Sequence, residues 1–92
     1  MSEPLDVMRK RLHMRSIRRG IKEMDLILMG FSKAHLADLN AEELGLYDQL
    51  LSENDHDLYQ WVSQQSVEPE AYRALMDKIR EGAVGVTKPA AG

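Results

Sequence analysis

Hydrophobic residues recur along this chain every three or four positions, the spacing that places them on one face of an α-helix. The clearest stripe runs from position 21 to position 34 and consists of Ile21, Met24, Ile27, Leu28, Phe31 and Ala34. The alternating or β-branched patterns that strands require are scarce. The sequence therefore predicts an all-α fold, a small single-domain bundle of about five helices.

Four shorter stripes predict the other helices. They consist of Leu5, Met8 and Leu12; Leu44, Tyr47 and Leu51; Leu58, Trp61 and Val62; and Tyr72, Leu75, Met76 and Ile79. Asn40 with Glu43 three residues later indicates a capping box for the third helix, and Asn54 or Asp55 can cap the fourth. Because Trp61 lies on an apolar face, we expect it to be a core residue.

The helical periodicity ends at Gly82. A length of 92 residues allows one small domain, which we assign to residues 1–82. Residues 83–92 are small and rich in Gly, Pro and Ala. This composition is typical of a disordered tail, and we expect the fold to survive its removal.

Composition excludes several classes of protein. The chain has no cysteine, so disulfides and thiolate chemistry are excluded. Its three histidines lack a metal-ligand spacing, and no metal site is expected. A glycine-rich phosphate loop and a nucleophile elbow are both missing from the sequence, which argues against an independent enzyme. No apolar run approaches the roughly 20 residues of a membrane span, and the first residues carry no visible export signal, so we expect a cytoplasmic protein.

The net charge of −3 hides a strong asymmetry. Residues 1–22 hold seven basic and two acidic residues, a charge of +5, whereas residues 23–92 hold five basic and thirteen acidic residues, a charge of −8. A basic end on an acidic body favours an oriented encounter with an acidic protein surface. The alternative is a small nucleic-acid-binding or regulatory module, with Arg9, Lys10, Arg11 and Arg15 on phosphates. Because aromatic residues for base stacking are missing from this segment, we expect no nucleic acid as partner.

The segment Arg19-Gly20-Ile21-Lys22-Glu23 separates the basic first helix from the long apolar stripe. Gly20 can adopt a positive φ, and its lack of a side chain allows another chain to approach closely. Arg19 and Glu23 are four residues apart, so they share a helix face if the second helix begins at or just before Gly20. A guanidinium beside a carboxylate on one surface is suited to binding a polar partner.

The residues from Arg15 to Leu26, RSIRRGIKEMDL, closely resemble the signature of the flavinylation factors, the succinate dehydrogenase assembly factor family that carries Arg-Gly-x-x-Glu. A second block, DHDLYQW from Asp55 to Trp61, resembles the family's Asp-x-Asp-Leu-x-x-Trp. The resemblance extends over roughly residues 9–80. Two blocks in the right order are far more specific than one short motif.

This resemblance implies a chaperone-like assembly factor that binds the flavoprotein subunit of succinate dehydrogenase or fumarate reductase and promotes covalent attachment of FAD to it. It implies no catalytic residue in this chain, no stably bound cofactor and a monomer. The residues that match the motif, and are expected to bind the partner, are Arg19, Gly20 and Glu23. Weaker candidates beside the motif are Ser16, Arg18 and Asp25.

Overall fold

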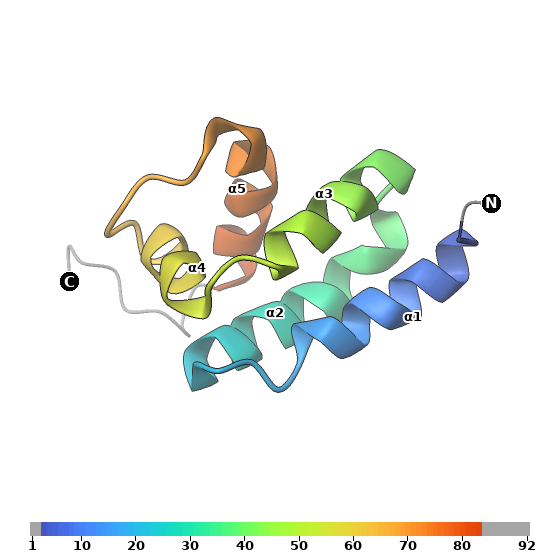
Figure 1. Ribbon diagram of the computed structural model, residues 1–92, viewed down its shortest axis with the longest axis horizontal. Helices are drawn as coiled ribbons and strands as arrows, with labels where there is room; N and C mark the ends of the chain where they lie inside the picture. The colour runs from blue at the N-terminus through green and yellow to red at the C-terminus, as the bar shows by residue number, and fades with distance from the viewer. Residues whose placement is uncertain (1–2, 84–92) are drawn as a thin grey trace.

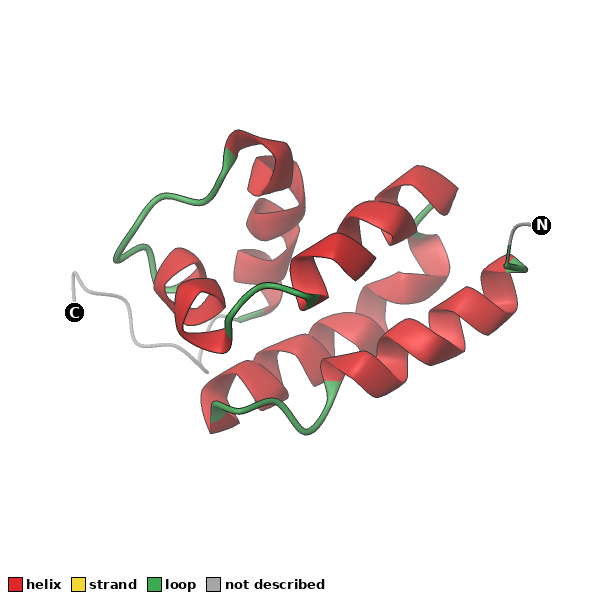
Figure 2. Cartoon of the chain, in the orientation of Figure 1, coloured by secondary structure: helices red, strands yellow, loops and turns green. Residues whose placement is uncertain are grey.

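The computed structural model describes residues 3–83 of the chain. This part contains five α-helices and two short 3-10 helices joined by loops (Figures 1 and 2). In chain order they are α1 (Leu5–Ser16), α2 (Lys22–His35), η1 (Leu36–Asp38), α3 (Ala41–Leu51), α4 (Asp55–Val62), η2 (Glu70–Tyr72) and α5 (Arg73–Gly82). The prediction of an all-α bundle is confirmed, and residues 3–83 contain no strand.

The second helix lies at the centre of the bundle. In Figure 1, α1 and α2 form an antiparallel hairpin. α1 also contacts α3, whereas α4 and α5 pack against α2. The predicted long stripe accounts for this arrangement, because four of its residues, Met24, Ile27, Leu28 and Phe31, are at most 2% exposed.

Local sequence signals explain where the middle helices begin. The capping box of α3 is confirmed, since the Glu43 amide donates to Asn40 Oδ1 at 2.8 Å and the Asn40 amide donates to Glu43 Oε1 at 3.0 Å. Of the two candidate caps for α4, the structure uses Asn54, whose Oδ1 accepts from the His56 amide at 2.8 Å. Asp55 is therefore available for a different contact.

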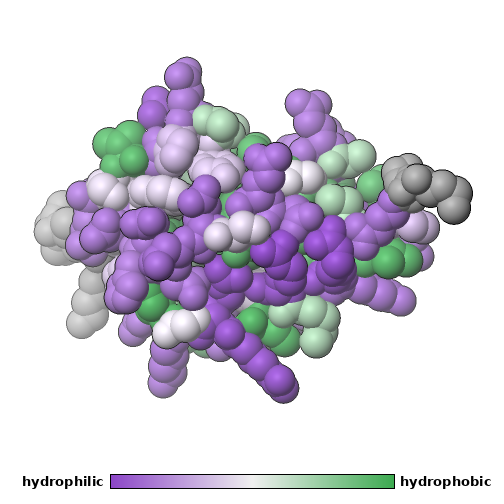
Figure 3. All heavy atoms as spheres, in the orientation of Figure 1, coloured by the Kyte–Doolittle hydropathy of each residue, from purple (hydrophilic) through white to green (hydrophobic). Residues whose placement is uncertain are grey.

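The core contains most of the predicted hydrophobic residues, and Trp61 is confirmed among them at 8% exposed. The first stripe is only partly correct: Leu12 is buried, but Leu5 is 39% exposed and Met8 is half-buried. The face shown in Figure 3 is mainly hydrophilic, with hydrophobic atoms in small separate groups. The apolar stripes thus largely face inward.

The domain boundary needs a correction at one residue. Ala83, which the sequence assigned to the tail, is 1% exposed and belongs to the hydrophobic core. Because alanine is small and apolar, composition alone could not separate it from the residues that follow. The rest of the predicted tail, residues 84–92, lies outside the described residues. Within the described range, the structure has no helix with the length and apolar character needed to cross a bilayer.

Candidate functional site

The segment between α1 and α2 lies at one end of the helical hairpin (Figure 1). α2 begins at Lys22, with Ile21 as its extended N-cap residue. Arg19 and Gly20 therefore precede the helix instead of opening it. The prediction that Arg19 and Glu23 share one helix face is wrong, because only Glu23 is helical.

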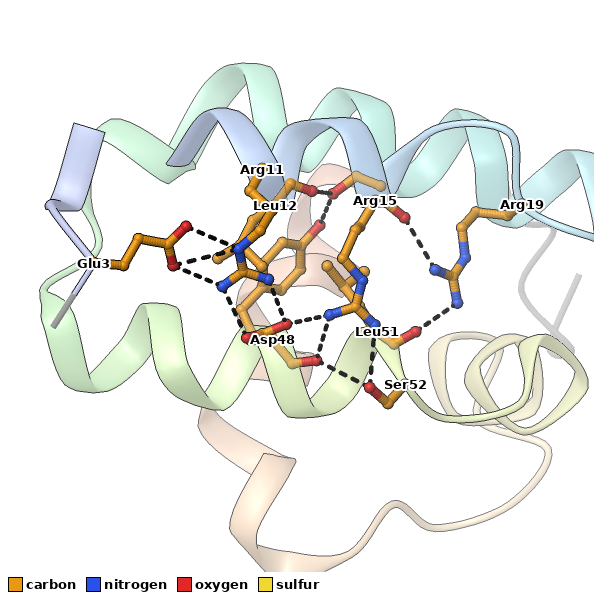
Figure 4. A network of polar contacts seen from close by, with 10 residues as sticks. Glu3, Arg11, Leu12, Arg15, Arg19, Asp48, Leu51 and Ser52 are labelled. Atoms are coloured by element: carbon orange, nitrogen blue, oxygen red, sulfur yellow. Dashed lines mark hydrogen bonds and ion pairs between the residues drawn. The ribbon is translucent and has the colours of Figure 1, made fainter. Parts of the chain in front are cut away.

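Arg19 is bound within the chain. Its Nε donates to Asp55 Oδ1 at 2.8 Å, and its two terminal nitrogens donate to the carbonyls of Arg15 and Leu51, each at 3.0 Å. Figure 4 shows the guanidinium between these two carbonyls. The side chain is only 12% exposed. Arg19 thus joins the loop to the end of α3 and the start of α4, and its guanidinium is mostly withdrawn from solvent.

Gly20 contacts the same carboxylate through its backbone. Its amide donates to Asp55 Oδ2 at 2.8 Å, and a Cβ atom at this position would lie 3.0 Å from that oxygen. The φ angle of Gly20 lies outside the left-handed region, so the positive φ that glycine can adopt is not used here. Any residue larger than glycine would press on Asp55, which approaches closely. We call these three residues, Arg19, Gly20 and Asp55, the Asp55 clamp.

The left-handed residue of the loop is Arg18, with a φ of 59°. Its amide donates to Asp25 Oδ1 at 2.6 Å, so Asp25 secures the loop from the first turn of α2. A non-glycine residue in this conformation costs roughly 1–3 kcal/mol and is more common at functional sites. The Arg18 side chain is exposed and has no partner within residues 3–83. It is therefore available to an external partner.

The remaining predicted residues differ in accessibility. Glu23 is exposed and has no partner within the described range, and neighbouring Lys22 is similar. Ser16 is completely buried, and its hydroxyl bonds to the Leu12 carbonyl and the Tyr47 hydroxyl. Ser16 is thus no part of the exposed surface, a correction to the prediction.

The Tyr47 hydroxyl that bonds to Ser16 is also buried. Burial raises the pKa of Tyr47 to about 12, so this hydroxyl stays neutral at physiological pH.

Sequence reasoning missed Asp55 as the residue that orders the loop. It assigned Asp55 to the cap of the fourth helix, yet Asn54 is the cap and the Asp55 carboxylate binds Arg19 and Gly20. The available signal was the second family-like block, which begins at this aspartate. Arg19 and Asp55 are 36 positions apart, so no local pattern in the sequence predicts that they pair.

The basic residues of α1 are largely neutralised on the side that faces α3. Figure 4 shows Arg11 between Glu3 and Asp48, and Arg15 bound to the same Asp48 carboxylate. The hydrogen bond from Arg11 holds the pKa of Glu3 below its ordinary value. Two of the four residues of the nucleic-acid alternative, Arg11 and Arg15, are therefore committed to carboxylates of their own chain.

We expect Asp55→Asn to destabilise the protein by about 1–3 kcal/mol, because it removes a charge-assisted acceptor from a mostly buried arginine. The measurement is urea unfolding followed by circular dichroism. Asp57→Asn is the matched control, since Asp57 is exposed in the same turn of α4 and has no partner within residues 3–83. Equal stability of the two variants would show that the Asp55 clamp contributes nothing to the fold.

The fold and the site together define a small helical interaction module that presents a firmly held polar loop. Residues 10–83 match the family model described as "Flavinator of succinate dehydrogenase". The chain belongs to this family, as the resemblance indicated. The family is one of assembly factors, in agreement with the expectation that the chain is not an enzyme in its own right.

Several relatives are similar over most of the chain. Succinate dehydrogenase assembly factor 2, mitochondrial, of Saccharomyces cerevisiae (strain ATCC 204508 / S288c) is 50% identical over 62 residues, which are 67% of this chain and 38% of the relative. Succinate dehydrogenase assembly factor 2-A, mitochondrial, of Drosophila persimilis is 38% identical over 80 residues, 85% of this chain and 50% of the relative.

The chain thus spans about half the length of the curated relatives it matches. These relatives are named as mitochondrial proteins, which gives no support to the cytoplasmic location expected from the sequence.

Proposed function

We propose that this chain binds the flavoprotein subunit of succinate dehydrogenase or of fumarate reductase and promotes covalent attachment of FAD to that subunit. Membership of the flavinator family supports the proposal. The structural observation that carries it is the loop between α1 and α2. Asp25 and Asp55 hold its backbone in place, while the side chains of Arg18 and Glu23 remain exposed.

The proposed contribution of the chain is orientation. A loop that is already ordered loses little conformational freedom when it binds, so more of the contact energy remains for holding the partner. In this proposal, the histidine that forms the bond and the flavin both belong to the client. The chain holds the client's flavin domain in the geometry where those atoms meet, an effect that can strongly accelerate a bond-forming step.

The hollow beside α3 is poorly suited to holding FAD. An open hollow of about 650 Å³ beside α3 is lined by Glu42 and Glu43, whose carboxylates would repel a pyrophosphate. We therefore propose that the client holds the FAD and that this chain contacts protein. No step of the proposed mechanism requires the chain to react with the flavin.

The test is co-expression of the client with a Glu23→Ala variant, followed by in-gel flavin fluorescence of the denatured client. We expect client flavinylation to fall by about tenfold when the factor is limiting, since a charged hydrogen bond contributes about 1.5–3 kcal/mol to binding. Stability of the isolated variant should change by less than about 0.5 kcal/mol, because Glu23 is exposed.

Glu81→Ala provides the matched control. Glu81 is an exposed glutamate of α5 without a partner within the described residues. Flavinylation should be normal with this variant. Normal client fluorescence with Glu23→Ala, or unfolding of that variant, would contradict the assignment of Glu23 to a partner-binding surface.

A further inference from the structure

A groove runs between α1 and α2, on the part of the hairpin remote from the Arg18–Glu23 loop. It has a volume of about 580 Å³. Lys10, His13 and Met14 of α1 line one wall, and Lys33, Leu36 and Ala37 of α2 and η1 line the other. Arg18, Arg19, Gly20 and Glu23 are not among the residues that line the groove, so the proposed function leaves it unused.

The groove has an apolar surface that the core does not cover. Met14 is 64% exposed although it is a large hydrophobic residue, and Ala37 is also exposed, while Leu36 forms a buried base. A flexible methionine beside open space is typical of an adaptable binding surface.

The ionisable residues that line the groove are all basic: Arg9, Lys10, His13 and Lys33. Lys10 and Lys33 are exposed and make no hydrogen bond or ion pair within residues 3–83. Arg9 donates only to the carbonyls of Leu36 and Leu39, both at 2.9 Å, so no carboxylate neutralises its charge within the described part of the chain. His13 bonds to the Ser32 hydroxyl.

The two sides of α1 therefore differ in charge. Toward α3, Arg11 and Arg15 are paired with Glu3 and Asp48. Toward the groove, Arg9, Lys10 and Lys33 form no ion pair with a carboxylate of residues 3–83. A surface of this kind attracts an occupant that carries carboxylates.

The shape of the groove suits a helix. Two packed antiparallel helices form a furrow into which the side chains of a third helix can insert. α3 occupies one side of α1, and α4 and α5 contact α2 elsewhere. The 12 residues of α1 extend about 18 Å, at about 1.5 Å per residue, which corresponds to between three and four turns of a partner helix.

We propose that this groove binds an acidic amphipathic helix of a partner protein. Its apolar residues would pack against Met14, Leu36 and Ala37, and its Asp or Glu side chains would pair with Lys10 and Lys33. This inference goes beyond flavinylation, because it assigns a second docking surface that needs neither the loop nor the flavin. An anionic membrane is the competing occupant, and the vesicle measurement below distinguishes it from a helix.

The test uses two synthetic helical peptides of about 14 residues, long enough to span the groove. They share the same apolar positions, and one carries Glu where the other carries Lys. Each is titrated into the isotope-labelled full chain and followed by NMR. We expect the acidic peptide to shift the amide signals of Lys10, Met14 and Lys33. It should bind at least about tenfold more tightly than the basic peptide, and its affinity should fall in 1 M salt.

Matched substitutions locate the binding. Lys33→Glu should weaken binding of the acidic peptide about fivefold. Lys22→Glu, the same change on another exposed lysine of α2 that has no partner within residues 3–83, should stay within about twofold. Met14→Asp should weaken binding, and Val67→Asp, at another exposed apolar residue, should not.

Four results would overturn the proposal. The first is equal affinity for both peptides, and the second is amide shifts confined to other helices. The third is binding of anionic phospholipid vesicles to the groove while the peptide does not bind. The fourth is a dimer in sedimentation that Met14→Asp dissociates, which would place a second copy of the chain in the groove. None of these measurements involves flavinylation, so failure here leaves the proposed function untouched.

Discussion

Replacing Gly20 with arginine is expected to abolish covalent flavinylation of the client while the variant remains helical. A Cβ atom at Gly20 would lie 3.0 Å from Asp55 Oδ2, the oxygen that accepts the Gly20 amide at 2.8 Å. That oxygen cannot retreat without lengthening its own hydrogen bond. The new side chain therefore disturbs the Asp55 clamp and covers the exposed face of the loop beside Arg18 and Glu23.

Gly20→Ala should have a milder effect. The φ angle of Gly20 lies outside the left-handed region, so alanine is compatible with the backbone, and a single methyl group requires a shift of only a few tenths of an ångström. Gly45→Arg is the matched control, because Gly45 of α3 has open space where a Cβ would be. Flavinylation should remain normal with it.

The measurement is in-gel flavin fluorescence of the denatured client after co-expression with each variant, together with circular dichroism of the isolated factor. A folded Gly20→Arg variant that supports normal client fluorescence would contradict the assignment of this loop to the activity. Loss of helix content in that variant would point instead to a structural role of Gly20, and the comparison with Glu23→Ala would then decide the functional role.

Most of the fold was predictable because its signals are local. A stripe of hydrophobic residues at helical spacing specifies which face of α2 is buried, and the Asn40–Glu43 box specifies where α3 begins. Trp61 could be assigned to the core for the same reason. The first helix was less predictable, since Leu12 is buried but Leu5 is largely outside the core, and α1 is held partly by polar contacts of Arg11 and Arg15.

The site was less predictable, because its contacts join distant parts of the chain. Arg19 and Asp55 are 36 positions apart, and their pairing depends on how α4 packs against the hairpin. The burial of Ser16 has a similar origin, since Tyr47 reaches it from α3. Gly20 was the residue free to adopt a positive φ, yet in the structure Arg18 is the left-handed residue of the loop, and the Asp25 carboxylate accepts its amide.

Trp61→Ala is expected to have the largest effect on stability. Trp61 is 8% exposed, and the centre of its ring lies 6.0 Å from that of Tyr72, so it packs α4 against η2, just before α5. Truncating a buried tryptophan costs about 3–5 kcal/mol, which in a domain of this size lowers the melting temperature by at least about 12 °C. Domains are commonly stable by only about 5–15 kcal/mol, so the variant should be close to unfolding.

The backbone of Trp61 also anchors the segment between α4 and α5. Its carbonyl accepts hydrogen bonds from Arg80, at 3.3 Å from Nε and 3.2 Å from Nη2, and the same guanidinium pairs with Glu68, which is 6% exposed. The Arg80 side chain is 19% exposed, and this burial lowers its pKa. A shift of α4 into the space left by the indole ring would strain this pair as well.

Urea unfolding followed by circular dichroism measures the effect of Trp61→Ala, with Gln60→Ala as control. Gln60 precedes Trp61 in α4 but is exposed, so its truncation should change the free energy of unfolding by less than about 0.5 kcal/mol. If Trp61→Ala lowers the free energy of unfolding by less than about 1 kcal/mol, the core tolerates the cavity, contrary to the packing described for Trp61 and Tyr72. The expected outcome instead makes Trp61 a structural residue, whose loss impairs flavinylation only through unfolding, in contrast to Glu23.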